Sequence, residues 1–141
     1  MERTLTIVKP DAVEAGNTGN ILAHLEQEGF RVLALTRVHL STAQARAFYE
    51  VHRERPFYDS LIEFMTSGPA VAVALEREDA VTHLRQVMGA TNPAEADDGT
   101  IRSLYASSIE RNAIHGSDSP ENAVIELGFF FSGAELIAAG R

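Results

Sequence analysis

The chain has 141 residues, of which 45% are hydrophobic and 23% are charged, a composition typical of one globular domain. It contains no cysteine, which excludes disulfides, thiolate metal sites and thiol catalysis and makes the cytoplasm the expected compartment. Twenty acidic residues against twelve basic ones give a net charge of −8, which argues against strong binding to nucleic acids or anionic membranes. No apolar run is long enough to span a membrane. We therefore expect one domain over residues 1–141, with a local basic pocket for any anionic ligand.

The first half of the chain alternates between strand and helix patterns. A segment of β-branched and apolar residues stops at Pro10, which predicts a short strand followed by a turn. Ser41 and Gln44 match a capping box, which predicts a helix that carries Phe48 and Tyr49. The predicted elements are, in order, a strand over 4–8, a helix over 19–28, a strand over 32–38, the capped helix after 41 and a helix over 56–66.

The second half repeats the pattern around a long irregular segment. The run AVAVAL over 70–75 predicts a buried strand, and Asp79 is placed to cap the helix that follows. Residues 89–99 have no periodicity and predict a loop, which at this length in a small domain is usually functional or mobile. Ser119 begins a capped helix with proline at its first position. Between the loop and this helix we expect a short helix over 101–107 and a brief strand over 112–115.

This order of elements predicts an α+β fold. It matches a βαββαβ plan of the ferredoxin-like type, in which a four-stranded antiparallel sheet carries helices packed on it. A right-handed crossover would join the first strand to a second strand of the same direction. We expect the helices to lie on one face of the sheet.

The segment NAIHGSDSP contains the strongest candidate for chemistry. His115 stands at the end of a predicted strand, immediately before the start of a helix, and a neutral imidazole there is a good nucleophile beside a place that attracts phosphate. Glu126, in the following helix, is placed to accept one imidazole N–H and so fix the tautomer. The same residues also fit an ordinary histidine at a strand end and a solvated glutamate, and spacing alone leaves both interpretations open.

Three cations and two aromatic side chains are further candidates. Lys9 is the only lysine of the chain and follows the first strand, while Arg85 and Arg102 flank the irregular loop. Together they would neutralise a polyphosphate, although arginines are also common at the surface. Tyr49 and Phe57 fit either a core or a platform for stacking a planar base. Neither metal-ligand spacing nor a Walker or Rossmann pattern is present, so we expect any magnesium to arrive with phosphate.

Several motifs resemble the nucleoside diphosphate kinase family in order and spacing. They are TLTIVKPDAV, ERPFY, FMTSGP, MGATNP followed by GTIR, and NAIHGSDS. The resemblance extends from Glu2 to Leu136. It implies a ferredoxin-like fold and reversible, ping-pong transfer of the γ-phosphoryl group from a nucleoside triphosphate, such as ATP or GTP, to a nucleoside diphosphate through a phosphohistidine. It also implies Mg²⁺ that bridges the nucleotide phosphates with little direct ligation by the protein.

The resemblance assigns roles to individual positions. His115 matches the nucleophile, and Ser117 and Glu126 match the pair that orients it. Tyr49 matches a residue that supports Lys9 and the catalytic pocket. Contacts with phosphates or ribose are implied for Lys9, Arg85, Thr91, Arg102 and Asn112, and contacts with the base for Phe57, Leu61 and Ile109.

Family members are oligomers built from a common dimer. Because this chain ends at Arg141, without the longer C-terminal segment of many hexameric relatives, we expect a dimer or a tetramer of dimers. The rival hypothesis is a non-enzymatic nucleotide-binding regulatory domain of the same fold. The presence of His115 together with its cationic neighbours favours the enzyme.

Overall fold

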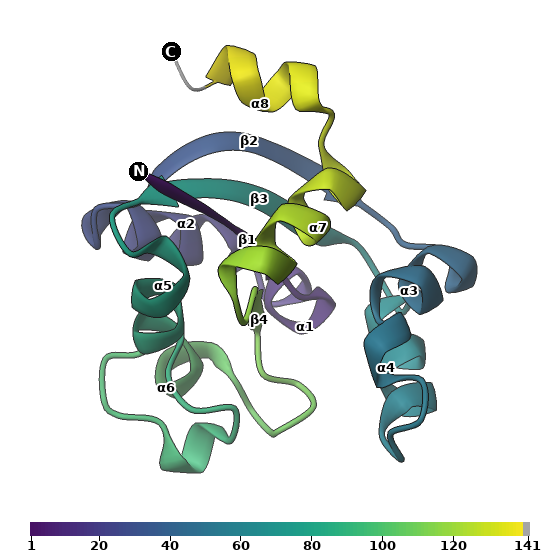
Figure 1. Ribbon diagram of the computed structural model, residues 1–141. Helices are drawn as coiled ribbons and strands as arrows, with labels where there is room; N and C mark the ends of the chain where they lie inside the picture. The colour runs from purple at the N-terminus through teal and green to yellow at the C-terminus, as the bar shows by residue number, and fades with distance from the viewer. Residues whose placement is uncertain (140–141) are drawn as a thin grey trace.

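A computed structural model of the chain describes residues 1–139 (Figure 1). Its sheet has the strand order β2-β3-β1-β4, and every neighbouring pair is antiparallel, as the α+β prediction requires. The strands are β1 (Glu2–Val8), β2 (Arg31–Val38), β3 (Ala70–Arg77) and β4 (Ile114–Gly116). Gly140 and Arg141, the chain end on which the expected oligomeric state was based, lie outside the described residues.

The helices connect these strands in the predicted order, with additions. They are α1 (Pro10–Glu14), α2 (Thr18–Gln27), α3 (Thr42–Phe48), α4 (Tyr58–Met65), α5 (Ala80–Met88), α6 (Ile101–Tyr105), α7 (Pro120–Phe130) and α8 (Gly133–Ala139), with short 3-10 turns at Glu50–His52 and Pro93–Glu95. The expected turn between the first strand and the next helix is present at Ala15 and Gly16. It is preceded by the unpredicted helix α1, which begins at Pro10 because proline is well tolerated at the first helical position and Asp11 follows it there.

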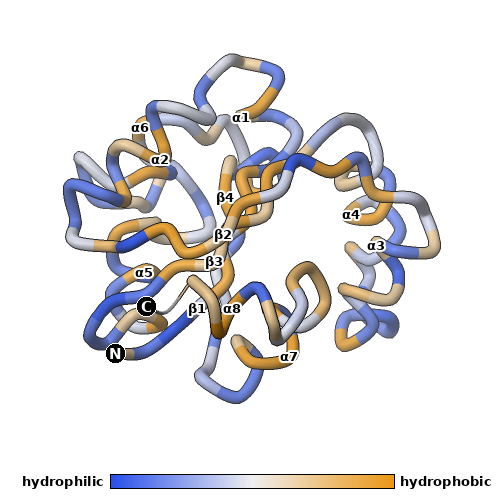
Figure 2. Tube along the Cα trace, turned by 90° about the horizontal axis from the view of Figure 1, so that it is seen from above, coloured by the Kyte–Doolittle hydropathy of each residue, from blue (hydrophilic) through white to orange (hydrophobic). Residues whose placement is uncertain are grey.

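Helices cover both faces of the sheet, so the expectation of a single covered face was wrong. Successive residues of a strand point to opposite faces, and along β3 Val71 belongs to one apolar cluster and Ala72 to the other. The first cluster contains residues of α1, α2, α5 and α6, and the second residues of α3, α4 and α7. AVAVAL is apolar at every position, so each face needs a cover. Figure 2 shows the apolar strands between the two helical layers.

Three predicted helix starts can be compared with the structure. Ser41 and Gln44 form the capping box, and the Ser119 hydroxyl accepts the Asn122 N–H. Asp79 does not cap α5 with its side chain, which was expected. Its backbone has a positive φ of 51°, and the Glu2 carboxylate instead accepts the Val81 N–H at 2.8 Å. The cap of α5 therefore comes from a strand distant in sequence.

Within residues 1–139, no single helix combines the length and apolar composition needed to cross a membrane. Helices α7 and α8 meet these criteria only when they are counted together, and they form a bent pair with an angle of 108° between them.

Candidate active site

The candidate nucleophile lies at the edge of the sheet, on the short strand β4. His115 is registered opposite Ile7 of β1, and its carbonyl accepts the Thr6 hydroxyl at 2.7 Å. The Ser117 N–H donates to the carbonyl of Leu5 at 3.2 Å. These contacts fix the backbone on both sides of the imidazole, because β1 is a central strand paired along both of its edges.

A carboxylate of α7 orients the imidazole. Nε2 of His115 lies 2.8 Å from Oε1 of Glu126, and the Ser117 hydroxyl donates to the same oxygen at 2.7 Å. Because a carboxylate only accepts, Nε2 must carry the proton, and Nδ1 keeps its lone pair in the neutral ring. Both side chains are largely shielded, with exposures of 17% for His115 and 20% for Glu126. Shielding from water strengthens this hydrogen bond.

Two aromatic rings pack against the imidazole: Phe48, the last residue of α3, and Tyr49, which follows it. The Phe48 ring lies edge-on to His115 at a centroid distance of 5.4 Å, and the Tyr49 ring does so at 6.1 Å. The Tyr49 hydroxyl is buried and has no hydrogen-bond partner among residues 1–139. Burial, and then the charge of Glu126, raises the pKa of Tyr49 well above its usual range, so this hydroxyl stays neutral. The Tyr49 hydroxyl makes no hydrogen bond to Lys9 within residues 1–139, and the Tyr49 ring contacts His115 in the catalytic pocket.

Lys9 lies where β1 ends, and only 7% of it is exposed. Its Nζ donates to Oδ1 of Asn112 at 2.7 Å. Burial, followed by repulsion from Arg102, lowers the pKa of Lys9 to about 8, while Asp11 and Glu110 act in the opposite direction. The ammonium group is therefore mainly charged at neutral pH but is much closer to losing its proton than an exposed lysine.

The two arginines of the predicted cation cluster have different surroundings. Arg102 is 6% exposed, and its guanidinium donates to the backbone carbonyls of Gly89, Asn112 and Ile114 at 3.1, 3.3 and 2.8 Å. Burial, and then Arg85, lowers the pKa of Arg102 to about 10, which leaves it cationic at neutral pH. Arg85 is exposed and makes one long contact, with the Gly116 carbonyl at 3.4 Å. Arg102 thus supports the loops beside β4, whereas Arg85 is available to an anion.

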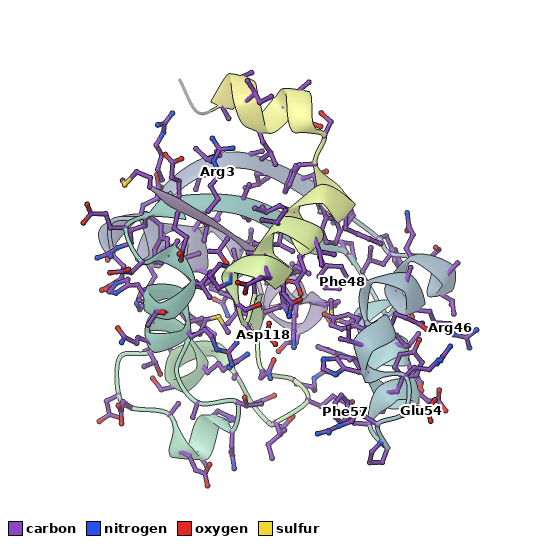
Figure 3. All side chains as sticks on the ribbon, viewed as in Figure 1. Arg3, Arg46, Phe48, Glu54, Phe57 and Asp118 are labelled. Carbon is purple, nitrogen blue, oxygen red and sulfur yellow. The ribbon has the colours of Figure 1, made fainter. Side chains whose placement is uncertain are left out.

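Two cavities meet at His115. One, of about 400 Å³, is lined by Lys9, Tyr49, His52, Phe57, Leu61, Thr91, Ile109, Glu110, Asn112 and His115. The other, of about 370 Å³, is lined by Phe48, Val51, His52, Arg85, Thr91, Arg102, His115, Gly116, Asp118, Asn122, Ile125 and Glu126. Figure 3 labels three of the lining residues: Phe48 from α3, Phe57 immediately before α4, and Asp118 from the segment before α7.

The outer end of the first cavity is apolar and open. Phe57 is 42% exposed and Ile109 is 60% exposed, while Leu61 is half-buried. The guanidinium carbon of Arg55 lies 5.6 Å from the centre of the Phe57 ring. Glu110, beside this end, accepts a hydrogen bond from the Ser60 hydroxyl. The combination offers a flat apolar surface with polar groups at its rim.

The structure brings all twelve residues predicted for the site into or directly behind these two cavities. Ser117 lines neither cavity and acts from behind, through Glu126. The sequence patterns did not single out Phe48, His52 or Glu110 as residues of the site. His52 lines both cavities and packs against Tyr49 at 6.3 Å between ring centroids. The close spacing of His52 to Tyr49 and Phe57 was the available signal.

Among residues 1–139, no group of three or more histidine, cysteine, aspartate or glutamate side chains is arranged to hold a metal ion. The cations at the site are instead positioned for an anion. A nucleophilic nitrogen, two buried cations and an exposed arginine around one continuous space can bind a polyphosphate and attack it.

Comparisons with known proteins agree with this chemistry. A family model described as nucleoside diphosphate kinase matches residues 2–136. A nucleoside diphosphate kinase of Persephonella marina is 53% identical over 97% of this chain and 98% of its own. The crystal structure of the Aquifex aeolicus nucleoside diphosphate kinase superposes with a TM-score of 0.93 at 50% identity, covering 95% of this chain and 97% of that one.

A halophilic nucleoside diphosphate kinase from Halobacterium salinarum, solved in complex with CDP, has a TM-score of 0.90 at 38% identity and covers 95% of this chain and 90% of its own. These matches extend over nearly the whole length of the chain. The chain belongs to the nucleoside diphosphate kinase family.

Proposed function

We propose that this chain transfers the γ-phosphoryl group of a nucleoside triphosphate to a nucleoside diphosphate, with Nδ1 of His115 as the nucleophile. The observation that carries the proposal is the 2.8 Å contact between Nε2 of His115 and Glu126. It assigns the ring proton to Nε2, so the Nδ1 lone pair is available without a separate general base.

In the first half-reaction the Nδ1 lone pair forms a bond to the γ-phosphorus while the bond from that phosphorus to the β,γ-bridging oxygen breaks. The electron pair leaves with the nucleoside diphosphate. The second half-reaction is the reverse, with a terminal oxygen of another diphosphate attacking the phosphohistidine. As Nδ1 becomes bonded to phosphorus the ring gains positive charge, and Glu126 stabilises that charge through the Nε2 proton.

Lys9, Arg85 and Arg102 supply the positive charge that phosphoryl transfer needs. Phosphoryl transfer depends mainly on positioning and on stabilising charge on the equatorial oxygens. Lys9 and Arg85 are proposed to contact phosphate oxygens directly, with Thr91 and Asn112 as neutral partners for phosphate or ribose. Arg102 adds charge from a position fixed by three backbone carbonyls. Mg²⁺ is proposed to enter as part of the nucleotide substrate, bound to its phosphates.

The base is proposed to lie at the open apolar end of the first cavity, on Phe57 and between Leu61 and Ile109. Every base has a π-face, so stacking there tolerates all four bases. The structure of the Halobacterium salinarum relative is a complex with CDP, which supports a cytidine nucleotide as a member of the proposed substrate class.

We further propose that residues 1–141 act as one nucleoside diphosphate kinase domain in the cytoplasm, assembled as a dimer or a tetramer of dimers. The family match over 2–136 supports the domain assignment. The eight-residue edge strand β2 is compatible with assembly, because its outer side pairs with no strand of the described chain.

A two-stage labelling experiment tests the proposal. The protein is incubated with [γ-³²P]ATP and Mg²⁺, freed of nucleotide by gel filtration, and then given UDP. The label is expected on the protein after the first stage and on UTP after the second. His115→Asn should take no label, while His39→Asn, at an exposed histidine outside the site, should behave as wild type. Transfer that requires both nucleotides together would contradict a phosphoenzyme mechanism and favour direct transfer.

A further inference from the structure

The chain enters β4 through a strained turn. Ala113 has a φ of 73°, in the left-handed region that side-chain-bearing residues rarely adopt. The Ile114 N–H donates to the Asn112 carbonyl at 2.9 Å. A hydrogen bond between residues i and i+2 around such a φ defines a γ-turn of the rare, strained kind. Ala113 is fully buried, so the turn lies inside the structure, two residues before His115.

Both backbone polar groups of Ala113 are held by the segment that follows β1. Its N–H donates to Oδ2 of Asp11 at 3.1 Å, and its carbonyl accepts the Lys9 N–H at 2.8 Å. Asp11 is separated from Ala113 by 102 positions in sequence and lies in the first turn of α1. The Asp11 carboxylate is thus the side chain that holds the amide of the strained residue.

The turn determines where two site residues lie. Asn112 precedes Ala113 and presents its Oδ1 to the Lys9 ammonium at 2.7 Å. Ile114 follows it and is registered opposite Val8, which sets the strand that carries His115. If Ala113 relaxed to a negative φ, the direction of the chain on one side of it would change relative to the other. Asn112 and His115 would then no longer keep their present separation.

We propose that Asp11 is a positioning residue for phosphoryl transfer: its carboxylate holds Ala113 in the γ-turn and so keeps Asn112 and Lys9 in register with His115. This inference rests on the proposed function. No role was assigned to Asp11 by the sequence patterns, which place it only beside Lys9.

The charge of Asp11 has a second effect at the same place. Oδ1 of Asp11 is buried and has no hydrogen-bond partner within residues 1–139. Its negative charge acts on Lys9 together with that of Glu110, against burial and against the positive charge of Arg102. Burial and these three charged groups therefore determine the charge state of Lys9, and the γ-turn determines its position.

A double-mutant cycle separates this role from a general effect on stability. Glycine adopts a positive φ without strain, so in Ala113→Gly the turn no longer depends on the hydrogen bond from residue 113 to Asp11. Asp11→Ala is expected to lower kcat at least tenfold with little change in KM, since a misplacement of about 1 Å costs on the order of 100-fold. In the Ala113→Gly background the same substitution is expected to lower kcat by less than about threefold, because glycine adopts the positive φ of the turn without strain. Both backgrounds are measured below neutral pH, where Lys9 stays protonated without the Asp11 charge. Glu14→Ala, at an exposed carboxylate of the same helix, is the matched control and should behave as wild type.

Two results would overturn the inference: an unchanged kcat in Asp11→Ala, or an equal loss in both backgrounds. If Asp11→Ala does not fold, Asp11→Asn is measured instead, because asparagine keeps the shape of the side chain but accepts a weaker hydrogen bond from the Ala113 N–H. Hydrogen exchange of the Ala113 amide should then be faster than in wild type, and unchanged exchange would contradict the clamp. Failure of the proposed function is distinguishable, since the wild-type protein would then form no phosphoenzyme at all.

Discussion

Among the single residues, the proposed role of His115 depends on one ring nitrogen being free while the other is held by a hydrogen bond. Glu126 accepts from both His115 and Ser117 through a single oxygen. Such an arrangement fixes the orientation of the ring as well as its tautomer. Phe48 and Tyr49 restrict the same ring from a second direction. The imidazole therefore needs little reorganisation before it attacks a phosphorus atom.

Glu126→Gln tests the orientation of the nucleophile. A carboxamide presents both a donor and an acceptor, so it no longer imposes one tautomer on His115. A hydrogen bond to a charged group contributes about 1.5–3 kcal/mol, which predicts a loss of roughly 10–100-fold in the rate of phosphoenzyme formation. Stopped-flow phosphorylation by ATP measures this rate, with Glu121→Gln, exposed on the same helix, as the control. Wild-type kinetics in Glu126→Gln would show that the carboxylate is not needed.

Lys9 predicts a specific pH dependence. A lysine is cationic below its pKa and neutral above it, and the pKa of Lys9 is lowered to about 8 by burial and then by Arg102. Phosphate binding by the free enzyme, and hence kcat/KM, should therefore fall as the pH rises through about 8. Since Lys9 is the only lysine, ¹³C-labelled lysine gives one resonance to titrate. A midpoint near the ordinary value of 10.5 would contradict the prediction, and bound ADP should raise the midpoint because its phosphates stabilise the charge.

Phe57→Ala tests the proposed base platform. Stacking on an aromatic side chain contributes about 1–3 kcal/mol per base. The substitution should therefore lower kcat/KM for ATP, GTP, CTP and UTP alike and reduce the differences among them. Steady-state kinetics with one common diphosphate acceptor measure this. Loss for one donor alone would indicate recognition of base edges rather than stacking.

At the scale of elements, the site is assembled from segments that the sheet brings together. β1 ends at Val8, immediately before Lys9, β4 carries His115, and α7 packs on β1 and places Glu126 beside His115. The guanidinium of Arg102 donates hydrogen bonds to the carbonyl of Gly89, at the start of the loop between α5 and α6, and to the carbonyls of Asn112 and Ile114, where the chain enters β4. These bonds connect the loop to β4. Arg102 therefore serves the fold as well as the charge of the site.

Two glycines of this loop provide an internal comparison. Gly89 and Gly99 have φ values of 84° and 85°. A Cβ at Gly89 would lie 2.5 Å from Oγ1 and 2.7 Å from Cβ of Thr100, whereas one at Gly99 meets nothing within 4 Å. Gly89→Ala should therefore destabilise the protein more than Gly99→Ala, by about 1–3 kcal/mol. Urea unfolding of both variants measures the difference, and equal losses would show that backbone conformation alone explains the cost.

Much of the element order was predictable from the sequence, because hydrophobic periodicity and capping signals are local. The strand over 70–75 and the capping box at Ser41 are examples. The cap of α5 was not predictable, since it comes from Glu2, 79 positions away from Val81. The prediction that helices cover one face of the sheet was wrong. The segment AVAVAL is apolar on both faces of its strand, which indicates that both faces of the sheet are buried.

For the molecule as a whole, the sequence motifs predicted which residues lie at the site. The orientation of those residues depends on contacts between segments that are distant in sequence. The pairing of His115 with Glu126 could be predicted because they are only eleven positions apart and Glu126 lies in the helix that follows His115. The clamp of Asp11 on Ala113 and the edge-on contact of Phe48 with His115 were not, since no local pattern encodes them. The net charge is −8, and within residues 1–139 both buried cations, Lys9 and Arg102, lie at one site.

The most direct test of the account identifies the phosphorylated atom. The phosphoenzyme is trapped after reaction with ATP, kept at alkaline pH, and examined by peptide mass spectrometry and by ³¹P-correlated NMR of the histidine ring. We predict one phosphoryl group per chain, on Nδ1 of His115. A phosphoryl group on Nε2, on Ser117 or on another histidine would contradict the assignment of the nucleophile that the contact with Glu126 supports.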